Sequence, residues 1–371
     1  MKLKVMQEKI YGGLRIVQGA VSKKTTLPIL NGILMEFKKD KGIHLTGTDL
    51  EIGIETWINT DIEEEGSIVL PAKNVAAIIR ELPNEIIDIT VNLENYKVTL
   101  ECMDSKFVIN GYNPDEFPSL PRVDNPVNIN INSEKFLKII EEVKFSTAVE
   151  ETQPALTGAL MVIDNDLIKM VSTNTYRLSY SQRKISENIE ENIRVILPGK
   201  TLNELSSLLL EKDKVKIQIN SNHASFEFGD ITVISRLIEG QFPNYEQVMP
   251  DEYNTSISVN RADFKKAAKR ASLIARQDSN IISLKIIESG KLIINSMDSD
   301  MGSAHEELAV ECRGPEQNIN IDADYLLDVL KIINEDDVIL EFVGSLNPLT
   351  IKKIKDEDKF IYLIMPVRPD A

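Results

Sequence analysis

Met170-Val171-Ser172-Thr173-Asn174-Thr175-Tyr176-Arg177-Leu178 is the stretch that decides the fold. It is typical of a strand that ends in a tight polar turn, and we expect Arg177 after the turn to face outward. A related stretch occupies residues 45–51, and a second occupies residues 294–301. One structural element therefore appears three times in the chain.

The spacing of these stretches gives the length of the repeat. The turn residues Asp49, Asn174 and Asp298 are 125 and 124 residues apart (174 − 49 and 298 − 174), and three such intervals nearly fill the 371 residues. An amphipathic helix pattern over residues 10–17 recurs over 136–143 and 264–271, offset by 126 to 128 residues. This period is far longer than the roughly 20–50 residues of a solenoid repeat, so each copy is a whole domain.

Each copy combines two helices with many short strands. The sequence predicts a first helix over residues 1–20 and a later one beginning after Pro71, with short alternating or apolar strands around them. This mixture predicts an α+β fold, in which three repeated domains each pack two helices on antiparallel sheets. We expect the domains to span residues 1–122, 127–249 and 254–371.

Composition narrows the class of protein. The two cysteines are far apart in the sequence, which favours a reducing compartment over a disulfide framework. The N-terminus has no apolar run typical of a signal peptide, and no stretch reaches about 18 apolar residues, so we expect no membrane association. The net charge of −16 makes nucleic acid a poor partner on bulk charge alone.

Catalytic and metal-binding patterns are weak. Residues 197–201 end in Gly-Lys-Thr, but Arg194 stands where a phosphate-binding loop needs its first glycine. Asp298 and Asp300 could hold a metal, yet two acids alone more often stabilise a turn. We therefore expect no enzyme activity, no catalytic residue, no metal and no cofactor. A metal-dependent enzyme using this acid pair is the most distant alternative.

One helix has a charge pattern that differs from the acidic chain around it. Over residues 260–276 the apolar residues form one face, and basic residues fill the opposite face with a single acid among them. The basic residues are Arg261, Lys265, Lys266, Lys269, Arg270 and Arg276. Such segregation predicts contact with the backbone of a polyanion.

A set of motifs distributed over essentially the whole chain resembles one family, the bacterial replicative sliding clamps, which are the beta subunits of DNA polymerase III. The motifs occur at residues 26–30, 47–51, 116–118, 156–158, 173–178, 239–245 and 365–368. The resemblance implies the DNA-clamp architecture, in which head-to-tail homodimers close a ring around duplex DNA without reading its sequence.

The resemblance also implies partners and site residues. The partners are the replicative DNA polymerase, the clamp loader and other proteins with a clamp-binding motif, in the cytoplasm with the nucleoid. Positions matching the pocket for partner peptides are Leu156, Thr173, Thr175, Tyr176, Arg177, Leu178, Pro243, Val248, Leu363, Ile364, Met365, Pro366, Val367 and Arg368. Positions matching DNA contacts include Lys24, Lys73 and Lys200, beside the basic helix residues.

The resemblance also implies a dimer interface, here called the seam of the ring. In it, Phe107 and Ile109 of the first domain of one copy contact Leu273 and Ile274 of the third domain of the other. The sequence departs from the family at Asn174, where Asp is common, and at Gln153 and Gln247, where Arg is frequent. The main alternative function is a three-domain scaffold that binds proteins without encircling DNA.

Overall fold

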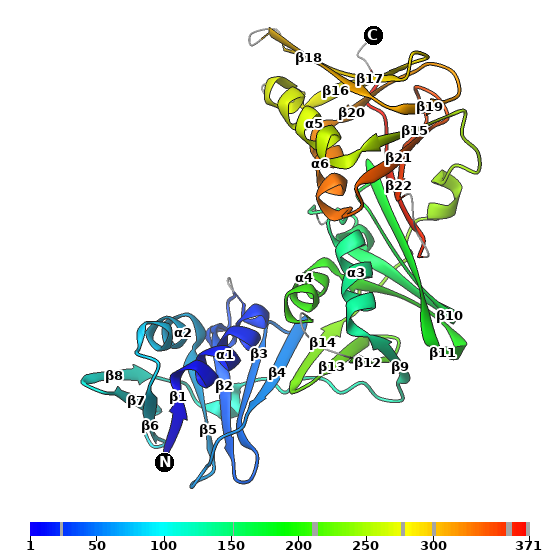
Figure 1. Ribbon diagram of the computed structural model, residues 1–371. Helices are drawn as coiled ribbons and strands as arrows, with labels where there is room; N and C mark the ends of the chain where they lie inside the picture. The colour runs from blue at the N-terminus through cyan, green and yellow to red at the C-terminus, as the bar shows by residue number, and fades with distance from the viewer. Residues whose placement is uncertain are drawn as a thin grey trace. The chain divides into compact units, whose positions relative to one another are not determined.

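The structure is a computed structural model, and it describes residues 1–22, 25–150, 152–209, 214–275, 279–298, 302–353 and 358–368. The chain divides into two compact units. Unit 1 comprises Met1–Glu134 and Lys200–Leu237, and unit 2 comprises Lys135–Gly199 and Ile238–Ala371 (Figure 1). Both units mix helices with antiparallel sheets, which confirms the predicted α+β class.

Unit 1 contains an eight-stranded and a four-stranded antiparallel sheet. The large sheet has the order β5-β2-β3-β4-β14-β13-β12-β9. Its strands are β5 (Gly66–Pro71), β2 (Gly32–Lys38), β3 (Gly42–Thr48), β4 (Ile52–Ile58), β14 (Ile231–Arg236), β13 (His223–Phe228), β12 (Lys214–Ile219) and β9 (Val127–Asn132). The small sheet consists, in order, of β1 (Lys2–Met6), β6 (Ile86–Asn92), β7 (Lys97–Cys102) and β8 (Ser105–Asn110).

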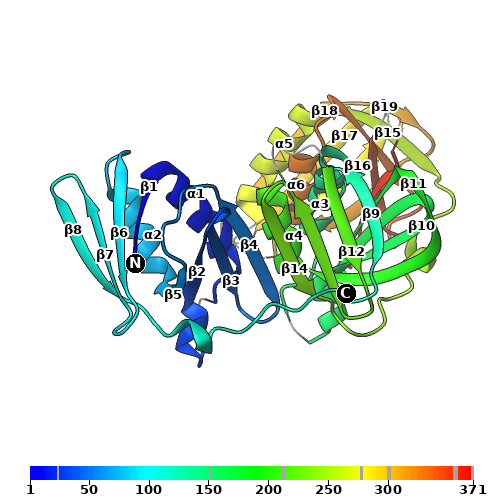
Figure 2. The same cartoon turned by 90° about the horizontal axis from the view of Figure 1, so that it is seen from below.

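Helices α1 (Gln7–Val17) and α2 (Ala72–Glu81) pack against each other, and α1 also contacts strands of both sheets (Figure 2). The predicted start of the first helix at residue 1 is wrong. Residues Lys2–Met6 instead form strand β1, because Leu3 and Val5 alternate with exposed residues and bury one face only.

Unit 2 contains a seven-stranded and a four-stranded sheet. The large sheet has the order β10-β11-β23-β22-β21-β15-β19. Its strands are β10 (Gly158–Thr173), β11 (Arg177–Pro198), β23 (Phe360–Ile364), β22 (Leu349–Lys353), β21 (Asp337–Phe342), β15 (Thr255–Asn260) and β19 (Glu311–Arg313). The small sheet consists, in order, of β18 (Gly302–Ala309), β17 (Lys291–Asp298), β16 (Ile281–Ile287) and β20 (Gln317–Asp322).

The other α-helices of the described residues follow in chain order. They are α3 (Ser133–Lys144), α4 (Gly199–Leu208), α5 (Arg261–Ala275) and α6 (Ala323–Ile332). On α5, Phe264 and four alanines of one face are buried against β16–β18, as the apolar stripe predicts. Asn260 caps the start of α5, because its Oδ1 accepts a hydrogen bond from Asp263 N–H.

A contact at the end of the first helix is repeated in all three copies. Ser172 Oγ donates to Val143 O at 2.5 Å, and Ser296 Oγ donates to Ala271 O at 2.8 Å. In the first copy Gly47 occupies the equivalent position, where a Cβ would lie 2.4 Å from Val17 O. The end of the helix therefore packs directly against the strand, which explains why the residue at this strand position is Gly or Ser in each copy.

A buried ionic cluster joins three elements of unit 2. Glu142 on α3 accepts hydrogen bonds from Arg183 Nη2 on β11 at 2.8 and 2.7 Å, and from Lys353 Nζ on β22 at 2.5 Å. All three side chains are buried, and Ser181 Oγ also donates to the Glu142 carboxylate. Asp358 Oδ2 also pairs with Arg183 Nε at 3.1 Å, and Glu335 Oε1 lies 3.7 Å from Lys353 Nζ, so acidic groups compensate both buried cations.

Candidate functional site

Two neighbouring strands of unit 2 bring together the residues predicted for a partner pocket. Strands β11 and β23 are antiparallel, with Leu178 opposite Leu363. Just beyond the end of β23, Met365 N–H donates to Tyr176 O at 2.8 Å. The turn before β11 and the segment after β23 are therefore adjacent in the fold, although they are distant in the sequence.

An apolar cluster lies beneath this pair of strands. Leu156, Leu178 and Leu363 are buried in it, together with Phe242 and Tyr245 from the segment that leaves the second repeat. Ile364 is the next residue along β23, so its side chain points to the opposite sheet face and lies in a different core cluster. Ile364 therefore supports the fold of unit 2 and does not face the predicted pocket.

Exposed apolar side chains flank the buried cluster. Tyr176 is 63% exposed, Val248 is 44% exposed and Met365 is 37% exposed. Among the other predicted pocket residues, Thr175, Pro243 and Arg368 are exposed and Pro366 and Val367 are half-buried. Exposed apolar groups above an apolar core provide a surface on which a partner's side chains can bury area.

The turn before β11 is held by hydrogen bonds from its own polar side chains. Buried Thr173 accepts from Thr175 N–H at 3.1 Å and donates to Arg177 O at 2.7 Å. Asn174 Oδ1 accepts from the N–H groups of Tyr176 and Arg177. Asn174 thus performs the acceptor role expected of Asp at this position.

Arg177 is not the outward-facing residue that the sequence predicted. Its side chain is only 11% exposed, and its Nη1 donates to Asp328 Oδ2 on α6 at 2.8 Å. Its Nη2 donates to Phe145 O, and the guanidinium lies 4.6 Å from the centre of the Tyr325 ring. Aromatic rings and a carboxylate attract the guanidinium inward, so Arg177 supports the wall of the site.

The environment of Asp328 favours its charged form. Burial opposes ionisation, but hydrogen bonds from Lys331 and Arg177 and their charges outweigh it, so the pKa of the Asp328 carboxyl is lowered. No local sequence pattern predicts this ion pair, because 151 residues separate Arg177 from Asp328.

Two tyrosines, Tyr180 and Tyr245, belong to the apolar cluster beneath β11 and β23. The Tyr180 and Tyr245 ring centres are 6.0 Å apart, and Tyr180 OH donates to Gln182 Oε1 at 2.6 Å. Burial raises the pKa of the Tyr180 phenol to about 12. The phenol therefore remains neutral and keeps its hydrogen bond across the physiological range. Neither tyrosine was among the predicted site residues, although Tyr245 belongs to a repeated exit motif.

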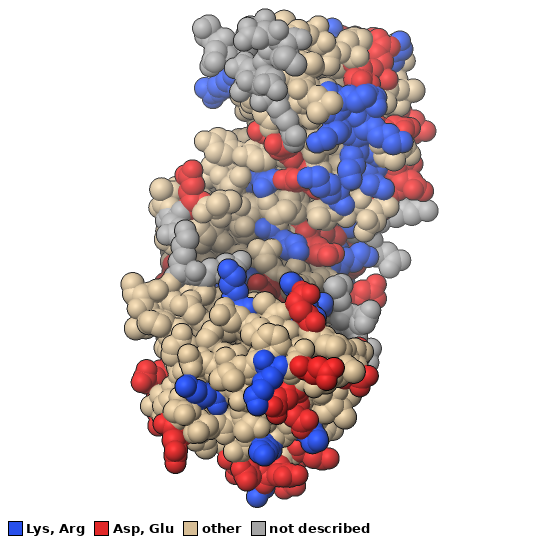
Figure 3. Space-filling model, turned by 90° about the vertical axis from the view of Figure 1, so that its left-hand side faces the viewer, with Lys and Arg blue, Asp and Glu red and all other residues tan. Residues whose placement is uncertain are grey.

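Basic side chains gather over α5 and α6. Figure 3 shows this part of the surface as a continuous patch of Lys and Arg. Lys265, Lys266 and Lys269 line a groove of about 660 Å³ there, with Lys331 opposite. Arg270, beside them, is in a bidentate pair with Glu306 at 2.7 and 2.6 Å. We name Lys265, Lys266 and Lys269 the α5 basic stripe.

Two of the other predicted DNA contacts, Arg261 and Lys200, have partners within the protein. Arg261 Nε donates to Glu335 O at 2.8 Å, so this guanidinium binds the backbone beyond the end of α6. Lys200 Nζ forms an ion pair with Asp49, which lies in the turn between β3 and β4. Lys73 is exposed on α2, and Lys24 lies outside the described residues. The lysines of the α5 basic stripe line an open groove, whereas the Arg261 guanidinium is bound to the backbone, so the stripe is the better candidate to bind a polyanion.

The predicted seam residues differ in exposure. Phe107 on the edge strand β8 is 39% exposed, whereas Ile109 is buried. At the end of α5, Leu273 is 56% exposed and Ile274 is half-buried. Val108, which is exposed between Phe107 and Ile109, was not among the predicted seam residues. An edge strand with exposed apolar residues is a ready surface for pairing with another chain.

Within the described ranges, no group of three or more His, Cys, Asp or Glu could hold a metal ion. Asp298 lies at the end of β17, and Asp300 falls outside those ranges. None of the described helices is long and apolar enough to cross a membrane.

Three family models match successive parts of the chain. They describe the N-terminal domain of the DNA polymerase III beta subunit over residues 1–121, its central domain over 130–244 and its C-terminal domain over 246–368.

Individual proteins of known sequence or structure are similar to the chain over nearly their whole length. The chain is 34% identical to the beta sliding clamp of Staphylococcus epidermidis, with 99% of each chain covered. The crystal structure of the DNA polymerase sliding clamp from Bacillus subtilis has 30% identity and a TM-score of 0.94, with 100% of each chain covered. A sliding clamp of Pseudomonas aeruginosa bound to griselimycin has 28% identity and a TM-score of 0.93, with the same coverage.

Proposed function

The chain belongs to the family of DNA polymerase III beta subunits, the beta sliding clamps, and we propose that two copies of it close a ring around duplex DNA. Members of this family are processivity factors of the replicative polymerase, and the sequence resemblance is confirmed. The proposed ring slides along DNA and tethers the polymerase, and it performs no chemistry of its own.

The observation that carries the proposal is the α5 basic stripe in a chain of net charge −16. Lysines without a base-reading element bind phosphates irrespective of sequence, so they allow movement along the duplex. Net negative charge elsewhere disfavours DNA on other surfaces. Topological linkage, and not tight contact, then retains the protein on DNA.

The proposed dimer is head-to-tail, with Phe107 and its neighbours on β8 meeting Leu273 and Ile274 on α5 of the second copy. A heterologous contact of this kind closes a ring only when both ends of each chain engage. The exposed apolar side chains of Phe107, Val108 and Leu273 support this assignment.

The proposed partner site is the exposed apolar surface around Tyr176, Val248 and Met365. There a polymerase, the clamp loader or another partner would insert apolar side chains of a short peptide. Such anchors usually contribute most of the binding free energy. We place these events in the cytoplasm, at the nucleoid.

Primer extension on a long single-primed circle tests this function. With the polymerase and clamp loader of the same organism, adding the chain should lengthen the products made in one binding event. Met365→Ala should shorten them while leaving the dimer intact. Equal product lengths with and without the chain would refute the proposed function.

A further inference from the structure

Two sheet ladders join the three repeats, which match the family models over residues 1–121, 130–244 and 246–368. Within unit 1, β4 of the first repeat pairs with β14 of the second. Within unit 2, β11 of the second repeat pairs with β23 of the third. We call these ladders, with the side chains packed around them, the first joint and the second joint. Both ladders are antiparallel and pair the same number of described residues, so the difference between the joints lies in their side chains.

Buried ion pairs cross the second joint. Glu142 on α3 of the second repeat accepts a hydrogen bond from Lys353 Nζ on β22 of the third at 2.5 Å. Arg183 on β11 pairs with Glu142 and, across the joint, with Asp358 at 3.1 Å. The side chains of Glu142, Arg183 and Lys353 are at most 5% exposed. A rotation of the third repeat against the second would separate these buried charges, which is unfavourable because each would lose its compensating partner.

The first joint has apolar residues at the positions of this buried ionic cluster. The interval between the repeated turns, the shared contact at the helix end and the strand register give the correspondence. The counterparts are Ile58 for Arg183, Ile16 for Glu142 and Phe228 for Lys353, offset by 125 or 126 residues (183 − 58, 142 − 16 and 353 − 228). Apolar contacts have no preferred direction, so they tolerate a rotation that ion pairs do not.

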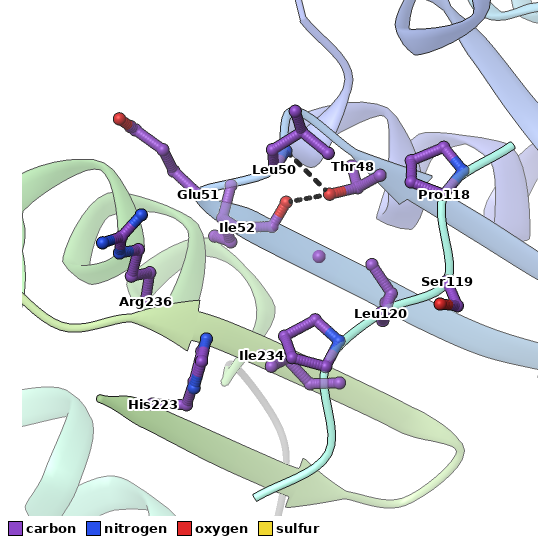
Figure 4. Close-up of a pocket in the computed structure, with 12 residues that line it drawn as sticks. Thr48, Leu50, Glu51, Ile52, Pro118, Ser119, Leu120, His223, Ile234 and Arg236 are labelled. Carbon is purple, nitrogen blue, oxygen red and sulfur yellow. Dashed lines mark hydrogen bonds between the residues drawn. The ribbon is translucent and has the colours of Figure 1, made fainter. Parts of the chain in front are cut away.

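The first joint also contains empty space at both ends of its ladder. A cavity of about 340 Å³ is lined by Ile16 and Ile58 of the first repeat and by Ile231 of the second. A cavity of about 210 Å³ lies at the opposite end, and Figure 4 shows residues of both repeats around it, with Ile52 on β4 and Ile234 on β14. Voids between packed elements remove contacts that would resist a shift of one element against the other.

One hydrogen bond has the same place in both joints. In the second joint, Gln182 N–H donates to Lys359 O at 2.8 Å, and in the first, Trp57 N–H donates to Asp230 O at 3.3 Å. The two donors are 125 residues apart (182 − 57), as the repeat requires. The bond is therefore longer in the first joint, and the two amides provide a matched pair of reporters.

We propose that the buried ionic cluster holds the second joint in one geometry and that the first joint is a hinge. The third repeat then stays fixed on the second, whereas the first repeat rotates against the second. In the proposed ring, bending that separates the two copies would occur at the first joint. That consequence rests on the proposed function, but the difference between the joints is a property of the chain alone.

Amide hydrogen exchange of the full chain, followed by NMR without DNA or a partner, tests this proposal. Exchange of a bonded amide requires local opening, so the protection of Trp57 and Gln182 measures how often each joint opens. We expect Gln182 to be protected about tenfold more than Trp57. Lys353→Met removes one charge of the cluster and keeps a long side chain, so it should lower the protection of Gln182 by about threefold or more and leave Trp57 unchanged.

Lys352→Met is the matched control. Lys352 lies on the opposite face of β22 and pairs with Glu341, outside the cluster, so this variant should leave both amides unchanged. A triple variant copies the first joint into the second. It combines Glu142→Ile, Arg183→Ile and Lys353→Phe, and it should lower the protection of Gln182 to that of Trp57.

Equal protection of Trp57 and Gln182 in the unchanged chain would overturn the proposal. Unchanged protection of Gln182 in Lys353→Met would also overturn it, as would an equal loss at both amides, because that is a global loss of stability. If the triple variant does not fold, the comparison of Lys353→Met with Lys352→Met still decides. Failure of DNA encirclement would leave these results as they are, so the two proposals are tested separately.

Discussion

The guanidinium of Arg177 and the carboxylate of Asp328 form a 2.8 Å ion pair that joins strand β11 to helix α6. The first of these residues adjoins the proposed partner site, and the second lies 151 positions further along the chain. The pair therefore couples the integrity of the site to the packing of the helix behind it.

Arg177→Ala should lower the free energy of unfolding by about 2 kcal/mol, because Phe145 O loses its charged donor and Asp328 keeps only Lys331. Urea denaturation measures this loss. Arg80→Ala is the matched control, since Arg80 pairs with Glu81 on an exposed surface and should cost less than about 0.5 kcal/mol. Equal stability of the two variants would show that the Arg177 contacts contribute nothing.

The Asp328 pair should also make stability depend on pH. Since the pKa of Asp328 is lowered in the folded state, its contribution is present above the unfolded pKa of about 4 and is lost as the pH falls through the folded value. The stability difference between the wild type and Asp328→Asn should thus be largest at neutral pH and shrink in acid. A difference that is constant from pH 7 to pH 3 contradicts this assignment.

Glu142→Gln should destabilise unit 2 by about 3–5 kcal/mol, because Arg183 and Lys353 would remain buried with too little compensating charge. Glu227→Gln is the control, as Glu227 pairs with Lys216 near the surface. Thermal melting of both variants gives the comparison. Similar melting temperatures would mean that water or rearrangement satisfies the buried cations.

Much of the fold was predictable because it is repeated. The period near 125 residues, the paired helices and the apolar faces all follow from local patterns that the structure confirms. The burial of Arg177 did not follow, because its partners Phe145, Tyr325 and Asp328 are adjacent only after folding. The polar turn before Arg177 therefore indicated a surface position that the tertiary contacts override.

The candidate site was predictable to a similar extent. Resemblance predicted Leu178 and Leu363 for the site, and the structure places them opposite each other, but periodicity alone could not separate Leu363 from Ile364. The face that each residue occupies depends on strand register, which is a tertiary property. Arg261 illustrates the same limit, because helix periodicity puts it among the α5 lysines while its guanidinium binds Glu335 O.

Replacing Lys265, Lys266 and Lys269 by Ala should weaken DNA binding equally for all sequences. Each lost phosphate contact should reduce the slope of log K against log salt by about 0.9. Arg261→Ala should instead mainly lower the melting temperature, because its side chain binds backbone carbonyls. Fluorescence anisotropy with duplexes of two unrelated sequences measures the slopes. A strong sequence preference, or an unchanged slope in the triple variant, is incompatible with the proposed contacts.

Retention on circular DNA tests the central claim most directly. The protein is loaded on a closed circle by the clamp loader, and gel filtration in high salt then separates bound from free protein before and after a single cut linearises the DNA. We predict that the ring remains on the closed circle and leaves the linear DNA, and that the combined change of Leu273 and Ile274 to Ala abolishes retention on both. Dissociation from the intact circle in high salt, or persistence on the linear form, would contradict encirclement.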